Sequence, residues 1–129
     1  MNHAQCGRAG YTMKVLFILN DAPYGTERAY NALRLARALT KRDVSAQVTV
    51  FLMADAVLAA KAHQKTPDGY YNVERMLKGV LGSQGLVLLC GTCLDARGLV
   101  EGELITGVRR STMDELAEAT LSADKVLVF

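Results

Sequence analysis

Short apolar runs alternate along the chain with stretches in which apolar residues recur at helical spacing. The apolar runs are rich in branched and aromatic side chains, and they end in polar or glycine-containing segments. This pattern is typical of buried strands. It predicts strands over residues 14–19, 44–53, 86–90 and 125–129.

The stretches at helical spacing predict amphipathic helices between these strands. The first begins at Thr26, which we take as its N-cap, and ends near Arg42. Another begins after Asn72, a second N-cap candidate, and ends near Gly82 or Gly85. Both helices should turn an apolar stripe toward the strands.

Two further helices are predicted from composition and capping. Residues 54–62 are rich in alanine and form a short helix, and Thr112 to Glu115 matches a capping box that opens another. Residues 98–110 are ambiguous and fit a short helix followed by an extended piece around Leu104 and Ile105. The apolar residues of the last helix that we expect to face inward are Met113, Leu116, Ala117 and Leu121.

Strands that alternate with helices predict a three-layer α/β/α sandwich with a mostly parallel sheet of about five strands. In such sheets ligands bind beyond the carboxyl ends of the strands. Here those ends bring together residues 20–26, Ala54 with Asp55, and residues 90–97. The two cysteines of the last segment, Cys90 and Cys93, therefore fall where chemistry is expected.

Composition limits the classes of protein to consider. The chain has 129 residues, half of them apolar, which suits one domain with its own core. Its formal net charge is +2 with both signs interspersed, so a nucleic-acid partner is not expected. No apolar run approaches the roughly twenty residues that span a bilayer, so no membrane partner is expected either. Residues 1–12 carry no secretory signal and are expected to be a disordered extension of a cytoplasmic domain over residues 13–129.

The segment VLLCGTCLDARG, residues 87–98, raises the question of what its cysteines do. A metal site needs about four ligands, and the other candidates are His63, His3 and Cys6, so we predict no metal and no cofactor. A dithiol pair, a single reactive thiol and a buried apolar cysteine all stay open at this point. The nearby cation of Arg97 could stabilise a thiolate, or it could be an ordinary surface residue.

Other polar residues fall on the same rim of the predicted sheet. They are Asp21, Tyr24, Thr26 and Asp55, for which helix capping is as good an explanation as ligand binding. His63 is the one histidine after residue 12 and lies in a polar loop, where a solvated role is the simplest. None of these residues is included in the candidate site.

Several segments resemble the DsrE/DsrF-like proteins, particularly their small YchN-like branch. The resemblance is carried by NDAPYGTERA at 20–29, TPDGYY at 66–71, CGTCLDARG at 90–98 and ADKVLVF at 123–129, and it covers residues 13–129. Its most specific part is a cysteine followed at a fixed interval by arginine and glycine.

The resemblance implies a three-layer α/β/α fold, assembly into homotrimers or homohexamers, and relay of sulfur as a cysteine persulfide between a donor and an acceptor protein. The reactive cysteine of the relay subunits falls on Cys90, eight residues before Gly98. Cys93 has no counterpart in those subunits, and Arg97 completes the candidate catalytic set. Whether the chain is a sulfurtransferase stays open. The alternative is a non-catalytic oligomeric module that binds a ligand or protein at the strand ends.

Overall fold

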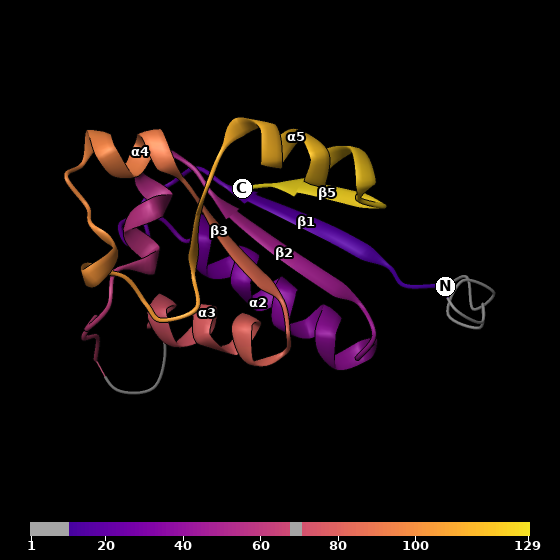
Figure 1. Cartoon of the computed structure of the whole chain (residues 1–129). Coiled ribbons are helices and arrows are strands. Elements are labelled where there is room, and N and C mark those ends of the chain that lie inside the picture. The colour runs from indigo at the N-terminus through magenta and orange to yellow at the C-terminus, as the bar shows by residue number, and fades with distance from the viewer. Residues whose placement is uncertain (1–10, 68–70) are drawn as a thin grey trace.

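Five parallel strands form one sheet in the order β4-β3-β2-β1-β5 in the computed structural model, which describes residues 11–67 and 71–129 (Figure 1). The expected sheet is confirmed, and every strand pair in it is parallel. Its strands are β1 (Lys14–Leu19), β2 (Gln47–Leu52), β3 (Leu86–Cys90), β4 (Arg109–Ser111) and β5 (Lys125–Val128).

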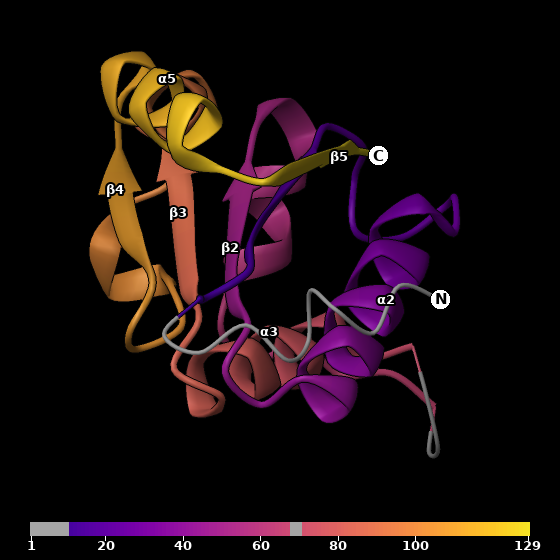
Figure 2. The ribbon, with the colours of Figure 1, turned by 90° about the vertical axis from the view of Figure 1, so that its right-hand side faces the viewer.

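Helices cover both faces of this sheet, which makes the three-layer α/β/α fold that the sequence predicts. α2 (Arg28–Arg42) and α3 (Val73–Gly82) lie under one face, and α5 (Met113–Ser122) lies over the other (Figures 1 and 2). The short elements η1 (Ala54–Ala60) and α4 (Gly91–Ala96) gather at the carboxyl ends of β2 and β3. A last short turn, η2 (Glu101–Glu103), follows α4.

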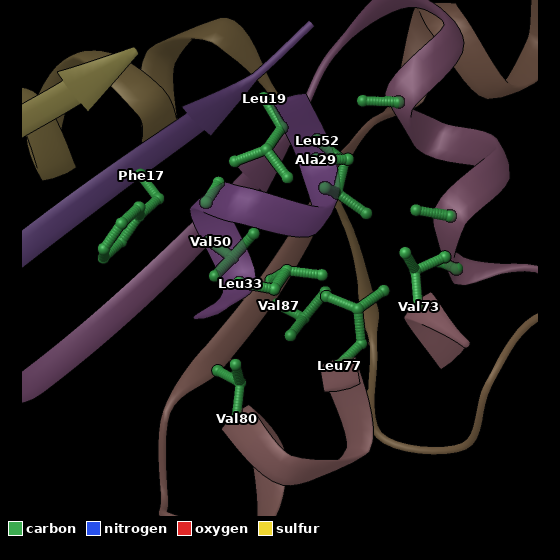
Figure 3. Packing of buried hydrophobic residues seen from close by; sticks show 14 of the residues in the cluster. Phe17, Leu19, Ala29, Leu33, Val50, Leu52, Val73, Leu77, Val80 and Val87 are labelled. Atoms are coloured by element: carbon green, nitrogen blue, oxygen red, sulfur yellow. The ribbon is translucent and has the colours of Figure 1, made fainter. Parts of the chain in front are cut away.

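The main core lies between the sheet and the pair α2 and α3. Figure 3 shows Phe17 and Val50 from the strands packed toward Leu33 of α2 and Leu77 of α3. These side chains are at most 2% exposed, and burying each large apolar side chain contributes about 1.5–3 kcal/mol. Because strand side chains alternate between faces, a second and smaller cluster lies under α5: Leu16, Phe51, Leu88, Cys90 and Leu116.

The helix caps agree only in part with the sequence predictions. The side chain of Asn72 accepts a hydrogen bond from Arg75 N at 3.0 Å, and Thr112 accepts one from Glu115 N at 3.1 Å, so both N-caps are confirmed. Thr26 is not the N-cap of α2, because Glu27 holds that position and the helix begins at Arg28. The side chain of Glu27 makes no capping hydrogen bond.

The prediction for residues 98–110, a short helix followed by an extended piece, is confirmed by η2 at Glu101–Glu103 and by the extended backbone of Leu104. The sequence did not predict two neighbouring elements, α4, which starts at Gly91 directly after β3, and the strand β4 at Arg109–Ser111. Leu104 is extended but forms only an isolated antiparallel bridge with Lys61. Two adjacent arginines carry no local strand signal, and β4 forms because it pairs with the end of β3.

The buried stripe of α5 also differs from the prediction. Leu116 is buried as expected, but Met113 and Leu121 are 60% and 88% exposed and Ala117 is exposed too. The helix instead contacts the sheet through Leu116, Ala119 and Ala123. Two valines of β5, Val126 and Val128, are 38% and 64% exposed, so apolar surface remains uncovered near this helix.

The helices of the described residues include none with the length and apolar character needed to cross a membrane.

Candidate functional site

Cys90 lies at the point where β3 ends and α4 begins. It is the last residue of the strand and the N-cap of the helix, so the chain turns directly at its side chain. Cys90 is 7% exposed, and it packs in the cluster under α5 with Leu88 and Leu116. Cys93 is one helical turn further on and half-buried, and neither cysteine is in a disulfide. The structure thus brings the two predicted cysteines together at one strand end.

Polar groups around Cys90 favour its thiolate. The sulfur lies 3.2 Å from the hydroxyl oxygen of Thr92. Burial alone raises the pKa of Cys90, but hydrogen bonds from the side chains of Thr92 and Cys93 and from their backbone N–H groups oppose it. Together these hydrogen bonds bring the pKa of Cys90 below its ordinary value. Cys90 is therefore the thiol that ionises first.

Cys93 has the opposite character. Burial and its hydrogen bond to Cys90 raise the pKa of the Cys93 thiol, while the N–H of Ala54 donates to its sulfur at 3.2 Å and opposes the rise. Ala54 has a φ of 49°, a left-handed conformation that is uncommon for alanine. Cys93 is thus a protonated neighbour that can donate to the Cys90 sulfur.

Arg97 is held by the backbone and by a carboxylate. Its Nη2 and Nε lie 2.8 Å and 2.9 Å from Asp55 Oδ1, and its Nη1 donates to the carbonyl oxygen of Cys93 at 3.0 Å. These contacts join α4 to the start of η1, where Ala54 meets Cys93. The hydrogen bonds of Arg97 therefore fix the cysteine turn, and none of them goes to a sulfur atom.

Sequence reasoning missed a second arginine beside the cysteine turn. Arg110 of β4 donates to both carboxylate oxygens of Asp95 in α4, at 2.9 Å and 2.8 Å. Its guanidinium lies over Gly91, where an added Cβ would come within 2.9 Å of it. Only the pairing of β3 with β4 brings Arg110 here, and no local sequence signal indicates that pairing. Ala54 and Thr92 lie at the strand ends where the sequence places them, but their contacts with the sulfur atoms of Cys93 and Cys90 were not predicted.

Most of the other rim residues make contacts away from the cysteine turn. Asp21 pairs with Arg28 at 3.4 Å, and Thr26 accepts a 3.4 Å hydrogen bond from Arg28 N. The Tyr24 hydroxyl donates to Gln64 at 2.5 Å and accepts from the N–H of Val73, which fastens the loop after β1 to the start of α3. Asp55 is the rim residue that reaches the cysteine turn.

No group of three or more His, Cys, Asp or Glu side chains is arranged to hold a metal within residues 11–67 and 71–129. The other two metal-ligand candidates of the sequence, His3 and Cys6, lie outside the described residues. What the site contains is a polarised thiol, a second thiol of higher pKa, and two arginine–aspartate pairs that fix the turn.

Comparison with known proteins gives consistent matches along nearly the whole chain. The profile of the DsrE/DsrF-like family matches residues 13–129. The protein YchN of Escherichia coli (strain K12) is 46% identical over 116 residues, which cover 90% of this chain and 98% of YchN. The uncharacterized protein MJ0989 of Methanocaldococcus jannaschii is 39% identical over 91% of this chain and its own full length.

Solved structures agree with these matches. The crystal structure of the ychN protein from E. coli superposes with a TM-score of 0.86 at 45% identity, over 91% of this chain and 99% of that one. A protein of unknown function from Methanobacterium thermoautotrophicum, MTH1491, has a TM-score of 0.70 at 17% identity, over 89% of this chain and 98% of its own. The second likeness shows the fold alone.

Proposed function

The chain belongs to the DsrE/DsrF-like family, which is associated with sulfur relay, and from this premise we propose that it carries sulfur as a persulfide on Cys90. The observation that supports this most is the inequality of the two thiols: the pKa of Cys90 is lowered and that of Cys93 is raised. Sulfur transfer needs one thiolate as nucleophile, and an unequal pair supplies it without ionising both.

Loading is a thiolate exchange. The Cys90 thiolate attacks the outer sulfur of a donor protein's persulfide, forms a new S–S bond, and the donor leaves as its thiolate, which takes up a proton from water. Cys90 then holds the sulfur as a persulfide anion. The hydrogen-bond donors that stabilise the Cys90 thiolate, Thr92 and Cys93, are placed to stabilise that anion as well. An acceptor thiolate removes the outer sulfur by the same exchange.

Cys93 supplies a second outcome. Its thiolate, once formed, can attack the inner sulfur of the Cys90 persulfide, so that a Cys90–Cys93 disulfide forms and sulfide leaves. The outer sulfur is reduced and the two cysteine sulfurs are oxidised, so a thiol reductant is needed to restore the dithiol. The raised pKa of Cys93 slows this discharge and favours delivery to the acceptor. Arg97 acts by holding the Cys93 turn and Asp55 together.

Donor and acceptor proteins are the proposed partners, in the reducing cytoplasm, and we propose that the chain works as a homotrimer or homohexamer. The exposed apolar residues Met113, Leu121, Val126 and Val128 on and beside α5 support an assembly, because a second copy would cover them. The buried position of Cys90, at 7% exposure, is what favours the alternative of a binding module without transfer.

The test loads the protein with a persulfide donor, such as a sulfur-charged cysteine desulfurase, and reads the intact mass. We expect a gain of about 32 Da, one sulfur atom, which a thiol reductant removes. Cys90→Ser should abolish this gain, and Cys93→Ser should prolong it because discharge is blocked. Cys6→Ser, a cysteine outside residues 13–129, is the matched control and should load like the parent.

Equal loading of Cys90→Ser and the parent would overturn the assignment of Cys90. Loading that maps to Cys93 in the parent protein, by peptide mass spectrometry, would exchange the two roles. If a persulfide donor loads neither the parent protein nor the Cys93→Ser variant, while the protein binds a partner through the strand ends, the binding module is the better explanation.

A further inference from the structure

A second candidate site lies away from the cysteines, between α2 and α3. A cavity of about 560 Å³ opens there, within the range of about 300–1,000 Å³ that small-molecule sites have. The two helices run side by side beneath the sheet (Figure 2). The cavity lies toward the amino-terminal ends of the strands, since it reaches Val48 at the start of β2, whereas Cys90 closes the opposite end of β3.

The cavity has an apolar floor. Its floor includes Leu33, Ala36 and Val80, which are buried. On the α3 side, Gly79 leaves space: an added Cβ would meet no atom within 4 Å. An apolar group could therefore lie between the helices without displacing a side chain.

The rim of the cavity is cationic. Arg34, Arg37 and Lys41 line it from α2, and Arg75 lines it from α3. α2 carries two further arginines and no acidic residue over its 15 residues. Within the described residues no carboxylate pairs with any of the four cations of the rim. The cavity therefore combines apolar surface with uncompensated positive charge.

Ordinary structural roles explain only part of this charge. Lys41 lies in the last turn of α2, where the helix dipole favours a cation. Arg34 donates to Asn31 at 3.1 Å and lies 5.6 Å from the centre of the Tyr30 ring. Arg37 has no such explanation, and Arg75 sits in the first turn of α3, where the helix dipole disfavours a cation.

We propose that this cavity binds a small anionic amphiphile. Its apolar chain lies on the floor beside Gly79, and its phosphate or carboxylate head is held by Arg37 and Arg75 from the two sides. A matching contact between two copies through this groove would bring two sets of four cations together, so a symmetric self-contact is disfavoured. The proposal is independent of the sulfur chemistry of Cys90.

The test measures binding of n-decyl phosphate to the full chain by titration calorimetry, below the concentration at which micelles form. We expect saturable binding that weakens with added salt, because the cations of the rim are near solvent. Inorganic phosphate and 1-decanol, the two halves of the probe, should each bind at least about tenfold more weakly. n-Decanoate separates a carboxylate from a phosphate preference, and either preference supports the proposal.

Variants locate the site. Arg37→Ala and Arg75→Ala should each weaken decyl phosphate binding by about fivefold to tenfold. Arg42→Ala is the matched control, since it removes an arginine of the same helix that does not line the cavity. Gly79→Phe should fill the floor and abolish binding while circular dichroism shows a folded protein. Cys90→Ser should bind like the parent, which separates this site from the proposed sulfur carrier.

Equal affinity of Arg37→Ala, Arg75→Ala and Arg42→Ala for the probe would overturn the proposal, as would decanol binding as tightly as decyl phosphate. If the rim variants instead change the oligomeric mass in light scattering and leave probe binding unchanged, the groove is a contact between copies and the proposal is wrong.

Discussion

Replacing Thr92 by valine tests the physical origin of the Cys90 reactivity. Valine keeps the shape of threonine and removes the hydroxyl that lies 3.2 Å from the Cys90 sulfur. If that hydroxyl donates to the thiolate, its loss raises the pKa of Cys90 toward the ordinary value. Backbone groups and Cys93 remain in place, so the variant removes one named contribution and leaves the others.

The magnitude follows from the contact. A hydrogen bond to a charged group is worth about 1.5–3 kcal/mol net, and an exposed donor and a sulfur acceptor place this one at the lower end or below. Removing this hydrogen bond raises the pKa of Cys90, and a loss of about 1 kcal/mol changes an ionisation equilibrium several-fold. Below both pKa values the thiolate fraction then falls about threefold to tenfold.

The assay is the rate of alkylation by iodoacetamide as a function of pH, followed on the Cys90 peptide by mass spectrometry. Cys6 lies on a different peptide, and Cys93, which lies on the same peptide as Cys90, is distinguished by sequencing the fragment ions of that peptide. The variant should react more slowly at neutral pH and approach the parent rate at high pH, where Cys90 is ionised in both proteins. Thr40→Val is the matched control, because its hydroxyl donates to the Arg37 carbonyl in α2, far from the cysteines.

An unchanged rate profile in a folded Thr92→Val protein would refute the reasoning, because the hydroxyl would then not stabilise the thiolate. A slower rate that persists at high pH would also refute it, since this would indicate altered access to the sulfur and no change in its pKa.

Two further predictions concern packing. Gly85→Ala should lower the free energy of unfolding by about 1–3 kcal/mol in urea denaturation, because its Cβ would come within 2.8 Å and 2.9 Å of the carbonyl oxygens of Val48 and Val80. Gly91→Ala should cost less than about 1 kcal/mol, since the three atoms nearest to its added Cβ belong to the movable guanidinium of Arg110; equal costs would contradict this contrast. Leu116→Ala, which truncates a side chain that is 8% exposed over Cys90, should cost about 2–4 kcal/mol and speed Cys90 alkylation at fixed pH. An unchanged alkylation rate would show that α5 does not limit access to the thiol.

The parts of the fold that are decided by residues close together in the sequence were predictable. β3 has the predicted bounds, and the caps at Asn72 and Thr112 form as expected, because each is decided within a few residues. α4 and β4 were not predicted. α4 follows β3 directly, and no side chain caps its start, so the sequence carries no capping signal for it. The position of β4 depends on pairing between Cys90 and Ser111, two residues that are far apart along the chain.

The same distinction between local and long-range effects applies to the candidate site. The placement of Cys90 and Cys93 at a strand end follows from hydrophobic pattern alone. The difference between their pKa values does not, because it depends on donors such as Ala54 N from another loop. Charge behaves similarly: cations that are interspersed along the chain gather on one groove once α2 and α3 lie together.

The position of β1 inside the sheet has a consequence for synthesis in the cell. β1 is flanked by β2 and β5, and the contact that joins Lys14 to Asp124 spans 110 residues. At about 5–20 residues per second, roughly 5–20 s pass between the emergence of these two segments from the ribosome. During that interval one side of β1 offers unpaired backbone groups to other nascent chains. The growing polypeptide is therefore exposed to mispairing along β1 until β5 appears, and a chaperone that shields this strand would act during that period.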